Sequence, residues 1–458
     1  MSKRRKVVVI GGGIGGYPAA IKAARLGAEV TLIEKADLGG TCLNWGCIPT
    51  KSLLHGAEVF RLVKEAPTFG IKTTKPIVDM GTLMGRKDQV VLGLRRGVAG
   101  LLKAKKIVVL QGEAELLDPC TVRVGKKKLL ADSVILATGS LPTSPPILGL
   151  DDITAWDSND FLSMTSLPES AIIIGGGVIG VEFAQILNGL GCQVTLIEMM
   201  PQLVPSLDGE IAHAFQKSLR SQGIQVVTGA KISKIGKSGK CSVIEYLSDN
   251  QKSQIEAQQL IVATGRRPAS DGLRADKIGL ELEGAAVKVD QYMSTNLSNV
   301  YAVGDLTGGV MLAHLAMAEG ECAAVNAMGG KQTMDYSSIP SCIYTMPQVA
   351  SVGLSEEQAK ERQKISVGIF PFSGVGKAVV LSQQEGFVKI VAGAQYGEVL
   401  GVHIIGPQAT DLISEAALAL NLEATVEEIA QTIHPHPTLS EAVMEAAMKL
   451  SGGAVHVP

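Results

Sequence analysis

The sequence lacks the features of a membrane, nucleic-acid-binding or exported protein. No uninterrupted apolar run in its 458 residues approaches the roughly 18–20 residues of a membrane-spanning helix. Its 42 basic and 44 acidic residues leave a formal net charge of −2, so no broad basic surface is expected for nucleic acid or anionic lipid. The basic start resembles a signal peptide, but the apolar run after it ends at residue 10, where glycines begin. We therefore expect a cytoplasmic protein that binds neither nucleic acid nor membrane.

The cysteines do not suit a disulfide framework, because they number seven and are spread over a long chain, as is typical of a reducing compartment. Two of them, Cys42 and Cys47, lie close together in GGTCLNWGCIPT, residues 39–50. A structural disulfide, a metal clip and a redox pair are the candidates. No second Cys-x-x-Cys and no His-rich cluster lies nearby to complete a tetrahedral zinc site. We therefore favour redox chemistry and expect no metal.

The composition indicates a globular protein of several domains. The length suggests roughly three of them. The chain is 46% hydrophobic and 19% charged, so it can bury large cores, and its 52 glycines predict many tight turns or loops that approach a ligand closely.

An internal repeat is the strongest signal in the sequence. Residues 7–35 and 171–199 align without a gap and are identical at 13 of 29 positions. Each copy has a β-branched run suited to a buried parallel strand, then GxGxxG, an amphipathic helix and VTLIE, which is the pattern of a βαβ unit. Glycines in such a loop permit the turn and let the backbone approach a pyrophosphate at the helix N-terminus. They are Gly11, Gly13 and Gly16 in the first copy and Gly175, Gly177 and Gly180 in the second.

An acidic residue ends the second strand of each copy, Glu34 in the first and Glu198 in the second. This is the spacing expected for a contact with a ribose hydroxyl, so two dinucleotide sites are predicted. A carboxylate at residue 198 repels a 2′-phosphate, and the MMPQ that follows contains no arginine to offset it. NAD is therefore favoured over NADP at the second site.

Proline- and glycine-rich segments at residues 141–152, 262–273 and 328–340 mark candidate domain boundaries. Beyond the last of these, QVASVGL, GFVKIVA and VLGVHIIG read as strands and DLISEAALALNL as a helix. The C-terminal part is therefore expected to be an α+β domain.

Taken together, these motifs resemble the pyridine nucleotide-disulfide oxidoreductase family, and most closely its dihydrolipoamide dehydrogenase members. The resemblance spans essentially the whole chain and is carried by the cysteine segment, both fingerprints, ILATGS, VATGRRP, YAVGDL and HPHPTLSE. It implies a glutathione reductase-like α/β fold with two Rossmann-like dinucleotide-binding domains and a C-terminal α+β dimerisation domain. The expected parts are an FAD-binding domain (1–142), an NAD-binding domain (143–265), a central domain completing the FAD site (266–337) and the dimerisation domain (338–458).

The resemblance also implies roles for the nucleotide-site residues. Those expected to hold FAD are Gly11, Gly13, Gly16, Glu34, Thr138, Gly139 and Asp305. Those expected to hold NAD are Gly175, Gly177, Gly180, Glu182, Glu198 and Gly265.

By the same resemblance Cys42 exchanges with the substrate, Cys47 contacts the isoalloxazine ring, and Lys51 lies near the flavin, paired with Glu182. A helix N-terminus stabilises a thiolate and lowers its pKa, and a lysine nearby adds to that effect. The two cysteines are therefore expected at the start of a helix.

A base is needed because a substrate dithiol is mostly protonated at neutral pH. The family places its catalytic histidine before PTLSE, which is His436 here, with Glu441 to orient it, whereas His434 has no such role. In the family this histidine comes from the partner subunit, so a homodimer is implied.

The resemblance implies an NAD-dependent dihydrolipoyl dehydrogenase that serves a lipoyl-bearing acyltransferase or carrier subunit. Several rivals share the fold. Glutathione and trypanothione reductases need basic residues after the second fingerprint, mercuric reductase usually has a C-terminal cysteine pair, and a soluble transhydrogenase would lack the redox pair. A non-enzymatic scaffold is disfavoured because thiols, base and both nucleotide loops are all present. One departure from the family is FPFSGVGKAVV at 370–380, where Val375 and Lys377 replace asparagine and arginine.

Overall fold

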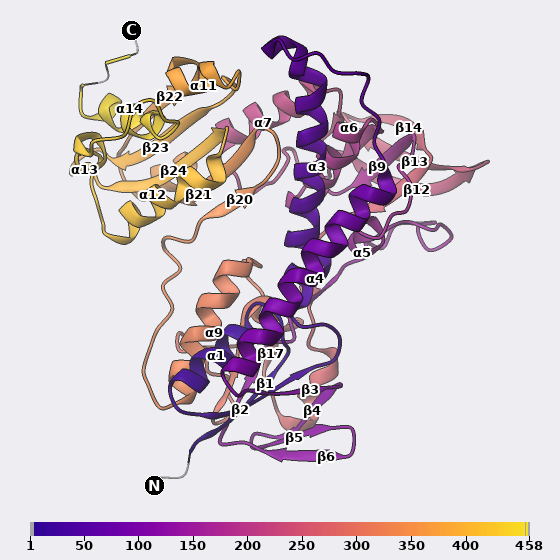
Figure 1. Cartoon of the computed structure of the whole chain (residues 1–458), viewed down its shortest axis with the longest axis vertical. Helices are drawn as coiled ribbons and strands as arrows, with labels where there is room; N and C mark the ends of the chain where they lie inside the picture. The colour runs from indigo at the N-terminus through magenta and orange to yellow at the C-terminus, as the bar shows by residue number, and fades with distance from the viewer. Residues whose placement is uncertain (1–3, 454, 457–458) are drawn as a thin grey trace.

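The computed structural model describes residues 4–453, 455 and 456. Figure 1 shows the N-terminal nucleotide unit as a lower lobe, with the second unit and the C-terminal domain side by side above it. Among the described residues, no helix combines the length and apolarity needed to cross a membrane.

The lower lobe contains a parallel sheet in the order β19-β7-β1-β2-β3. The β-branched run of the first copy forms its central strand, and apolar side chains cover both faces, as expected for a parallel sheet enclosed by other elements. Helices α1 (Gly16–Arg25) and α9 (Ala313–Ala327) pack together on one face. The strands are β1 (Lys6–Ile10), β2 (Glu29–Glu34), β3 (Val108–Gln111), β7 (Ser133–Leu136) and β19 (Val300–Ala302).

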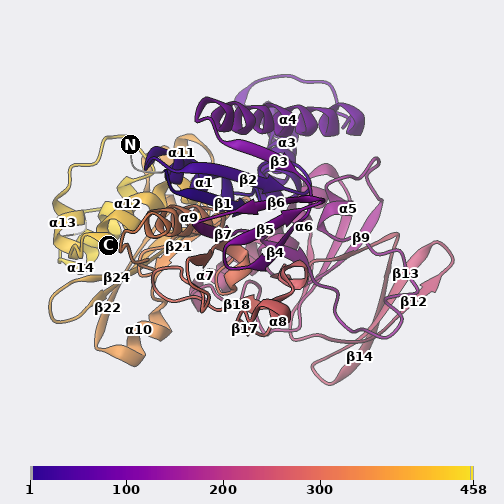
Figure 2. The same cartoon turned by 90° about the horizontal axis from the view of Figure 1, so that it is seen from below.

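The other face is covered in part by a small antiparallel sheet, visible in Figure 2, which views the lower lobe from below. Its strands are β4 (Ala114–Asp118), β5 (Thr121–Val124) and β6 (Lys127–Leu130). Because β19 lies beside β7, the segment expected to complete the first nucleotide site shares the sheet of residues 1–142.

The second copy of the repeat forms a parallel sheet in the order β11-β10-β9-β15. A separate antiparallel sheet, β12-β13-β14, extends beside it (Figure 2). The elements are β9 (Ser170–Ile174), α6 (Val178–Leu190), β10 (Gln193–Ile197), α7 (Gly209–Ser221), β11 (Gln225–Val227), β12 (Lys231–Ser238), β13 (Cys241–Ser248), β14 (Gln251–Ala257) and β15 (Gln259–Val262).

Two long helices join the lower lobe to the upper part, α3 (Cys47–Glu65) and α4 (Met80–Ala104) (Figure 1). Leu53 and Ala57 of α3 are fully buried in the same apolar core as Phe183 and Ile186 of α6. The core of the second nucleotide unit therefore includes residues from the first 142, which fixes the two units against each other.

The C-terminal domain is an antiparallel sheet with helices packed on it, so the predicted α+β character is confirmed. The strand order is β20-β21-β24-β23-β22. The segments read as strands form β21, β23 and β24, and the expected helix is α12. The elements are β20 (Ser341–Ile343), β21 (Gln348–Gly353), α10 (Glu356–Arg362), β22 (Ile365–Pro371), α11 (Gly376–Val380), β23 (Phe387–Gly393), β24 (Val399–Gly406), α12 (Ala409–Asn421), α13 (Val426–Gln431) and α14 (Glu441–Leu450).

Short elements complete the chain between these sheets. They are α2 (Gly40–Trp45), the 3-10 helix η1 (Ala66–Phe69), β8 (Ser140–Pro142), α5 (Ser158–Phe161), β16 (Arg266–Pro268), η2 (Asp271–Leu273), α8 (Ala275–Ile278), β17 (Leu282–Glu283), β18 (Ala286–Val287), η3 (Gly304–Thr307) and η4 (Phe372–Gly374).

Candidate active site

One cavity of about 1470 Å³ brings most of the predicted site residues together. It is lined by residues that follow strands of both parallel sheets, at the carboxyl ends where ligands bind in such folds. The predicted residues that line it are Gly11, Gly13, Glu34, Cys42, Cys47, Lys51, Thr138, Gly139, Gly175, Gly177, Glu182, Glu198, Gly265 and Asp305. Four predicted residues do not line it, namely Gly16, Gly180, His436 and Glu441.

The glycines of the first fingerprint have two different roles, close packing and leaving space in the cavity. Gly11 has φ +106°, and a Cβ there would lie 2.1 Å from the carbonyl oxygen of Ala137. A Cβ on Gly16 would lie 1.9 Å from the oxygen of Gly11. Close packing of strand and helix therefore requires glycine at both positions. Gly13 borders the cavity, and a Cβ there would have its nearest neighbour at an ordinary 3.6 Å, on Gly40.

The second fingerprint repeats this division. Gly175 also has φ +106°, and a Cβ on Gly180 would lie 1.9 Å from its carbonyl oxygen. A Cβ on Gly177 would have no neighbour within 4 Å and would extend into the cavity. In each loop the middle glycine therefore leaves room for a ligand, and the outer two allow close packing.

The two acidic strand ends have matching contacts. Glu34 accepts hydrogen bonds from the backbone N–H groups of Gly12 and Ala36, both at 2.7 Å. Glu198 accepts from Gly176 at 2.6 Å and Met200 at 2.7 Å. An ionised carboxylate has about four lone-pair directions, so each keeps acceptor capacity for ribose hydroxyls.

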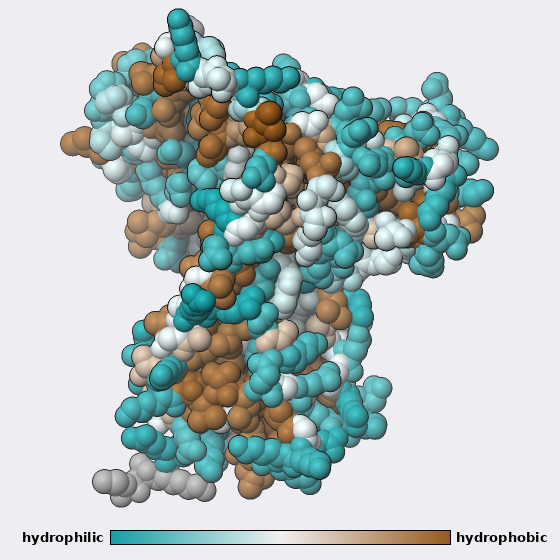
Figure 3. All heavy atoms as spheres, turned by 45° about the vertical axis from the view of Figure 1, so that its right-hand side comes forward, coloured by the Kyte–Doolittle hydropathy of each residue, from teal (hydrophilic) through white to brown (hydrophobic). Residues whose placement is uncertain are grey.

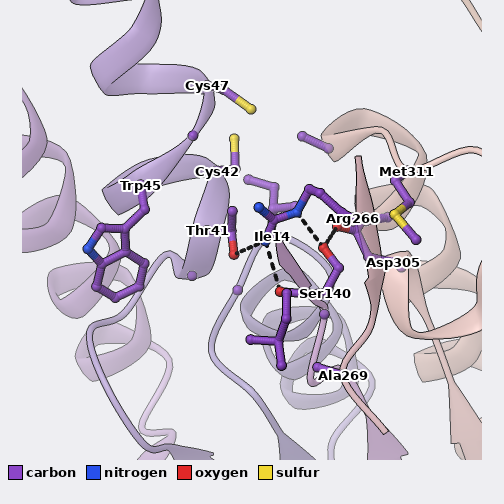
Figure 4. Close-up of a pocket in the computed structure, with 18 of the residues that line it drawn as sticks. Ile14, Thr41, Cys42, Trp45, Cys47, Ser140, Arg266, Ala269, Asp305 and Met311 are labelled. Atoms are coloured by element: carbon purple, nitrogen blue, oxygen red, sulfur yellow. Dashed lines mark hydrogen bonds between the residues drawn. The ribbon is translucent and has the colours of Figure 1, made fainter. Parts of the chain in front are cut away.

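Asp305 lies in the 3-10 helix η3 (Gly304–Thr307) and accepts a hydrogen bond from the hydroxyl of Ser140 (Figure 4). Arg266 donates to the same hydroxyl at 2.7 Å and to the carbonyl oxygen of Ser140 at 2.8 Å. Its guanidinium also lies 3.5 Å from the hydroxyl of Thr41, which precedes Cys42. Burial lowers the pKa of Arg266, and the negative charge of Asp305 opposes that shift.

Cys42 lies in the short helix α2, and Cys47 is the first residue of α3, so the prediction that both stand at one helix start holds only for Cys47. The two side chains point toward each other, and both are free thiols (Figure 4). A hydrogen bond from Cys42 and the charge of Lys51 lower the pKa of Cys47 to about 7, despite burial. The same hydrogen bond and burial raise the pKa of Cys42.

Lys51 and Glu182 both line the cavity and form an ion pair, with Nζ 2.8 Å from both carboxylate oxygens. Glu182 is buried in α6 and also accepts the backbone N–H of Tyr344 at 3.0 Å. The ammonium group of Lys51 lies 4.6 Å from the centre of the Tyr344 ring. The contact expected between the lysine and the glutamate is therefore present, with a tyrosine of the C-terminal domain added to it.

His436 and Glu441 also lie together, on the C-terminal domain. Nδ1 of His436 is 2.8 Å from a carboxylate oxygen of Glu441, and the imidazole is 77% exposed. Burial opposes a fall in the pKa of Glu441, but hydrogen bonds from His436 and Thr438 outweigh it, so this pKa is lowered. Because the carboxylate can only accept at Nδ1, Nε2 is left free to take a proton. His434 is instead held by Glu415 at 2.8 Å.

Sequence reasoning missed Arg266, Ser140 and Tyr344, and also the segment 311–314, which lines the cavity where α9 begins. Ser140 is the last residue of ILATGS and Arg266 lies within VATGRRP, so these two segments contained site residues besides their glycines. Nothing in the sequence pattern indicates that Tyr344, nearly 300 residues from Lys51, would reach its side chain.

The residues present fit a dinucleotide at each fingerprint. Each loop has a glycine whose Cβ would stand in the cavity, a helix N-terminus beyond it and a carboxylate with acceptor capacity. Among the described residues there is no cluster of three or more His, Cys, Asp or Glu suited to a metal ion.

Comparison with known families agrees with this arrangement. The model of the pyridine nucleotide-disulphide oxidoreductase family matches residues 5–320, and that of its dimerisation domain matches residues 339–447. The chain belongs to this family.

The chain is 41% identical to a dihydrolipoyl dehydrogenase of Bacillus subtilis, with all of both chains covered. It is 43% identical to a dihydrolipoyl dehydrogenase of Thermus scotoductus, with 99% of each covered. Among solved structures, it is similar to the HOCl-induced flavoprotein disulfide reductase RclA of Escherichia coli, with a TM-score of 0.86, 27% identity, and 97% and 99% of the two chains covered.

These findings confirm the predicted glutathione reductase-like fold and the assignment as an oxidoreductase that uses FAD and NAD(H). The match to the dimerisation domain supports the predicted homodimer.

Proposed function

We propose that this chain is an NAD-dependent dihydrolipoyl dehydrogenase. It would oxidise dihydrolipoamide on the lipoyl arm of an acyltransferase or carrier subunit to lipoamide and reduce NAD⁺ to NADH. The observation that carries the proposal is that a thiol pair, Lys51 and both dinucleotide loops line the same cavity. The full-length similarity to dihydrolipoyl dehydrogenases supports the choice of substrate.

We assign the first nucleotide loop to FAD and the second to NAD. For FAD the proposed residues are Gly11, Gly13, Gly16, Glu34, Thr138, Gly139 and Asp305. For NAD they are Gly175, Gly177, Gly180, Glu182, Glu198 and Gly265. The bound flavin and nicotinamide would supply the transfer of the electron pair from sulfur to NAD⁺. The absence of a basic residue at 199–207, next to Glu198, supports NAD over NADP.

The sulfur chemistry is an exchange between the substrate dithiol and a disulfide joining Cys42 to Cys47. One substrate thiol gives its proton to His436, and its thiolate attacks the Cys42 sulfur. The enzyme's S–S bond breaks and Cys47 leaves as a thiolate. The second substrate thiol gives its proton to Cys42 as its sulfur attacks the first, which breaks the mixed disulfide and closes lipoamide. The enzyme pair has then gained two electrons.

The opposite pKa directions of the two thiols suit these roles. A thiol of lower pKa is the better leaving group in exchange, and Cys47, with a pKa of about 7, is that group. The raised pKa of Cys42 keeps the proton on the sulfur that meets the substrate. Lys51 stabilises the Cys47 thiolate, and Glu182 holds Lys51 in place.

We assign the base to a second copy of the chain. His436 does not line the cavity of its own chain and is largely exposed, which supports its use in the cavity of a partner. Glu441 would orient the imidazole through Nδ1. The odd number of cysteines, spread over a long chain, supports a reducing compartment such as the cytoplasm.

The test is steady-state reduction of NAD⁺ and of NADP⁺ by free dihydrolipoamide. We expect Cys42→Ser to abolish the activity and His436→Gln to lower kcat at least 100-fold, the lower range for loss of a general base. The exposed Cys120→Ser is the matched control and should behave as wild type. Equal activity in all four proteins would refute the roles, and a preference for NADP⁺ would refute the assignment of Glu198.

A further inference from the structure

A buried ionic cluster lies outside the cavity, where the second nucleotide unit meets the C-terminal domain. Its centre is Lys389 on β23, whose side chain is 1% exposed. Its ammonium group lies 2.6 Å from Glu356, 2.9 Å from Asp208 and 3.2 Å from Glu210. Glu356 belongs to the C-terminal domain, whereas the other two carboxylates belong to the nucleotide unit at the start of α7. Both views place α7 against the C-terminal sheet (Figures 1 and 2), and α7 contacts β24.

Asp208 connects this cluster to the backbone of both domains. One of its oxygens accepts the N–H of Glu210 at 3.1 Å, which caps the N-terminus of α7. The other accepts the N–H of Glu356 at 3.1 Å, at the start of α10. Its side chain is fully buried, so these contacts and Lys389 together replace the solvation that burial removes.

The segment before Asp208 leads directly to the second fingerprint. At its start, Glu198 accepts the N–H groups of Gly176 and Met200. Midway, the N–H of Val204 donates to the carbonyl oxygen of Gly176 at 2.9 Å. Val204 has φ +44°, a conformation that a β-branched residue adopts only when its surroundings impose it. Residues 198–208 are thus fixed at the fingerprint loop, at Val204 and at the Lys389 cluster.

We infer that Lys389 is a positioning residue for the NAD site. By holding Asp208, the C-terminal domain fixes the segment that supports Glu198 and the Gly176 backbone, so the domain that forms the dimer also sets the nucleotide affinity. The inference rests on the proposed assignment of NAD to the second fingerprint. The link runs from Lys389 to Asp208, then from the neighbouring Leu207, whose N–H donates to the carbonyl oxygen of Val204 at 2.9 Å, and from Val204 to Gly176.

The experiment measures the dissociation constant of NADH by fluorescence in flavin-loaded holoenzyme, together with kcat and both KM values. We expect Lys389→Met and Asp208→Asn each to weaken NADH binding and raise the KM for NAD⁺ at least threefold. The kcat, the KM for dihydrolipoamide and the flavin content should stay within twofold of wild type. Asparagine keeps the capping acceptor of α7, so Asp208→Asn decides the question if Lys389→Met does not fold.

Two further variants make the outcome specific. Lys360→Met removes an exposed lysine that pairs with the same Glu356 and should leave NADH binding unchanged. Glu198→Gln tests the assigned site itself and should weaken NADH binding.

If Glu198→Gln weakens binding while Asp208→Asn does not, the inference about the cluster is overturned and the proposed function stands. If Glu198→Gln has no effect on NADH, the site assignment fails instead. A loss of thermal stability in Asp208→Asn with unchanged NADH affinity would show a merely structural role and would also overturn the inference.

Discussion

At the scale of residues, Cys42 and Cys47 have the same side chain, but their surroundings shift the two thiol pKa values in opposite directions. Cys47 receives a hydrogen bond from Cys42, lies near Lys51 and begins α3, and these favour its thiolate over the effect of burial. Cys42 donates that hydrogen bond and is partly buried, so its pKa is raised and it keeps its proton. As pH rises through about 7, the reduced pair therefore comes to carry one proton, on Cys42, and one negative charge, on Cys47.

The charged side chains beside Cys47 predict that two substitutions shift its pKa in opposite directions. Lys51 lowers the pKa of Cys47 and Glu182 raises it. In reduced, flavin-free protein, thiolate absorbance should rise in a step near pH 7. Lys51→Met should move this step to higher pH, and Glu182→Gln should move it to lower pH, in each case relative to the wild-type midpoint.

Cys47→Ser, measured in the same way, identifies the group that titrates. The step near pH 7 should be absent in this variant. Midpoints that are the same in wild type, Lys51→Met and Glu182→Gln would contradict the account of the thiolate.

The two kinds of fingerprint glycine give a second prediction. Gly177→Ala would place a methyl group in the cavity with no protein atom within 4 Å, so NADH should bind about tenfold or more weakly, which is about 1.4 kcal/mol, with unchanged thermal stability. Gly180→Ala would place its methyl 1.9 Å from the oxygen of Gly175, so the fold itself should be destabilised. Calorimetry of both variants with NADH titration distinguishes the two. Equal loss of stability in both would contradict the division of roles.

At the scale of elements, local patterns predicted the parts of the fold that local chemistry determines. The repeat predicted β1, α1 and β2 and their counterparts β9, α6 and β10, because strand and helix periodicity and the glycine loop all lie within 30 residues. The alternating strands of the C-terminal domain were predicted for the same reason. The packing of α3 into the second nucleotide core was missed, since its apolar face does not specify which of two cores it covers.

The Lys389 cluster was missed for a related reason. Its four charged residues are separated by up to 181 positions, and only the tertiary fold brings them together. A lone lysine in GFVKIVA is consistent with an exposed strand residue, so the strand was predicted and its buried charge was not.

The ion pair between Asp208, at the start of α7, and Lys389, on β23, predicts how the stability of the protein depends on pH. Burial raises the pKa of Asp208, but hydrogen bonds from Lys389 and the Glu356 N–H, with the charges of His403 and Lys389, outweigh it and lower this pKa. Such a carboxyl contributes stability above its unfolded pKa of about 3.9, and that contribution is lost as pH falls through the lower folded value. The Tm difference between wild type and Asp208→Asn should therefore be constant from about pH 7 to 5 and shrink below about pH 4.

The exposed Asp276→Asn is the control for this measurement and should not differ from wild type at any of these pH values. A difference between wild type and Asp208→Asn that persists unchanged to about pH 3 would contradict the assignment of the charge to this cluster.

At the scale of the whole molecule, the C-terminal domain presents apolar side chains that a single chain leaves uncovered. Ile433, next to the histidine segment, is 94% exposed, and Val380, Leu418 and Leu422 are also exposed. Figure 3 shows hydrophobic residues gathered on the surface of the lower lobe and of the upper part of the molecule. Apolar side chains left exposed on one domain agree with the dimerisation-domain match.

A dimer with a shared site makes a prediction that a single-chain site does not. Cys42→Ser homodimers should be inactive, and His436→Gln homodimers should retain at most about 1% of the wild-type kcat. After subunit exchange in equal amounts, half of the dimers are mixed, and one of their two sites pairs an intact Cys42 with an intact His436. The mixture should therefore recover about a quarter of the wild-type activity. No recovery, with exchange shown by mass spectrometry, would place both groups in one chain.

The most direct test of the account is the visible spectrum of the purified protein during stepwise reduction by dihydrolipoamide without oxygen. The account predicts a yellow protein that develops a long-wavelength band when partly reduced, because the Cys47 thiolate would then contact the flavin. It also predicts that Cys47→Ser lacks this band. A colourless protein that takes up no flavin, or a yellow one without the band, would contradict it.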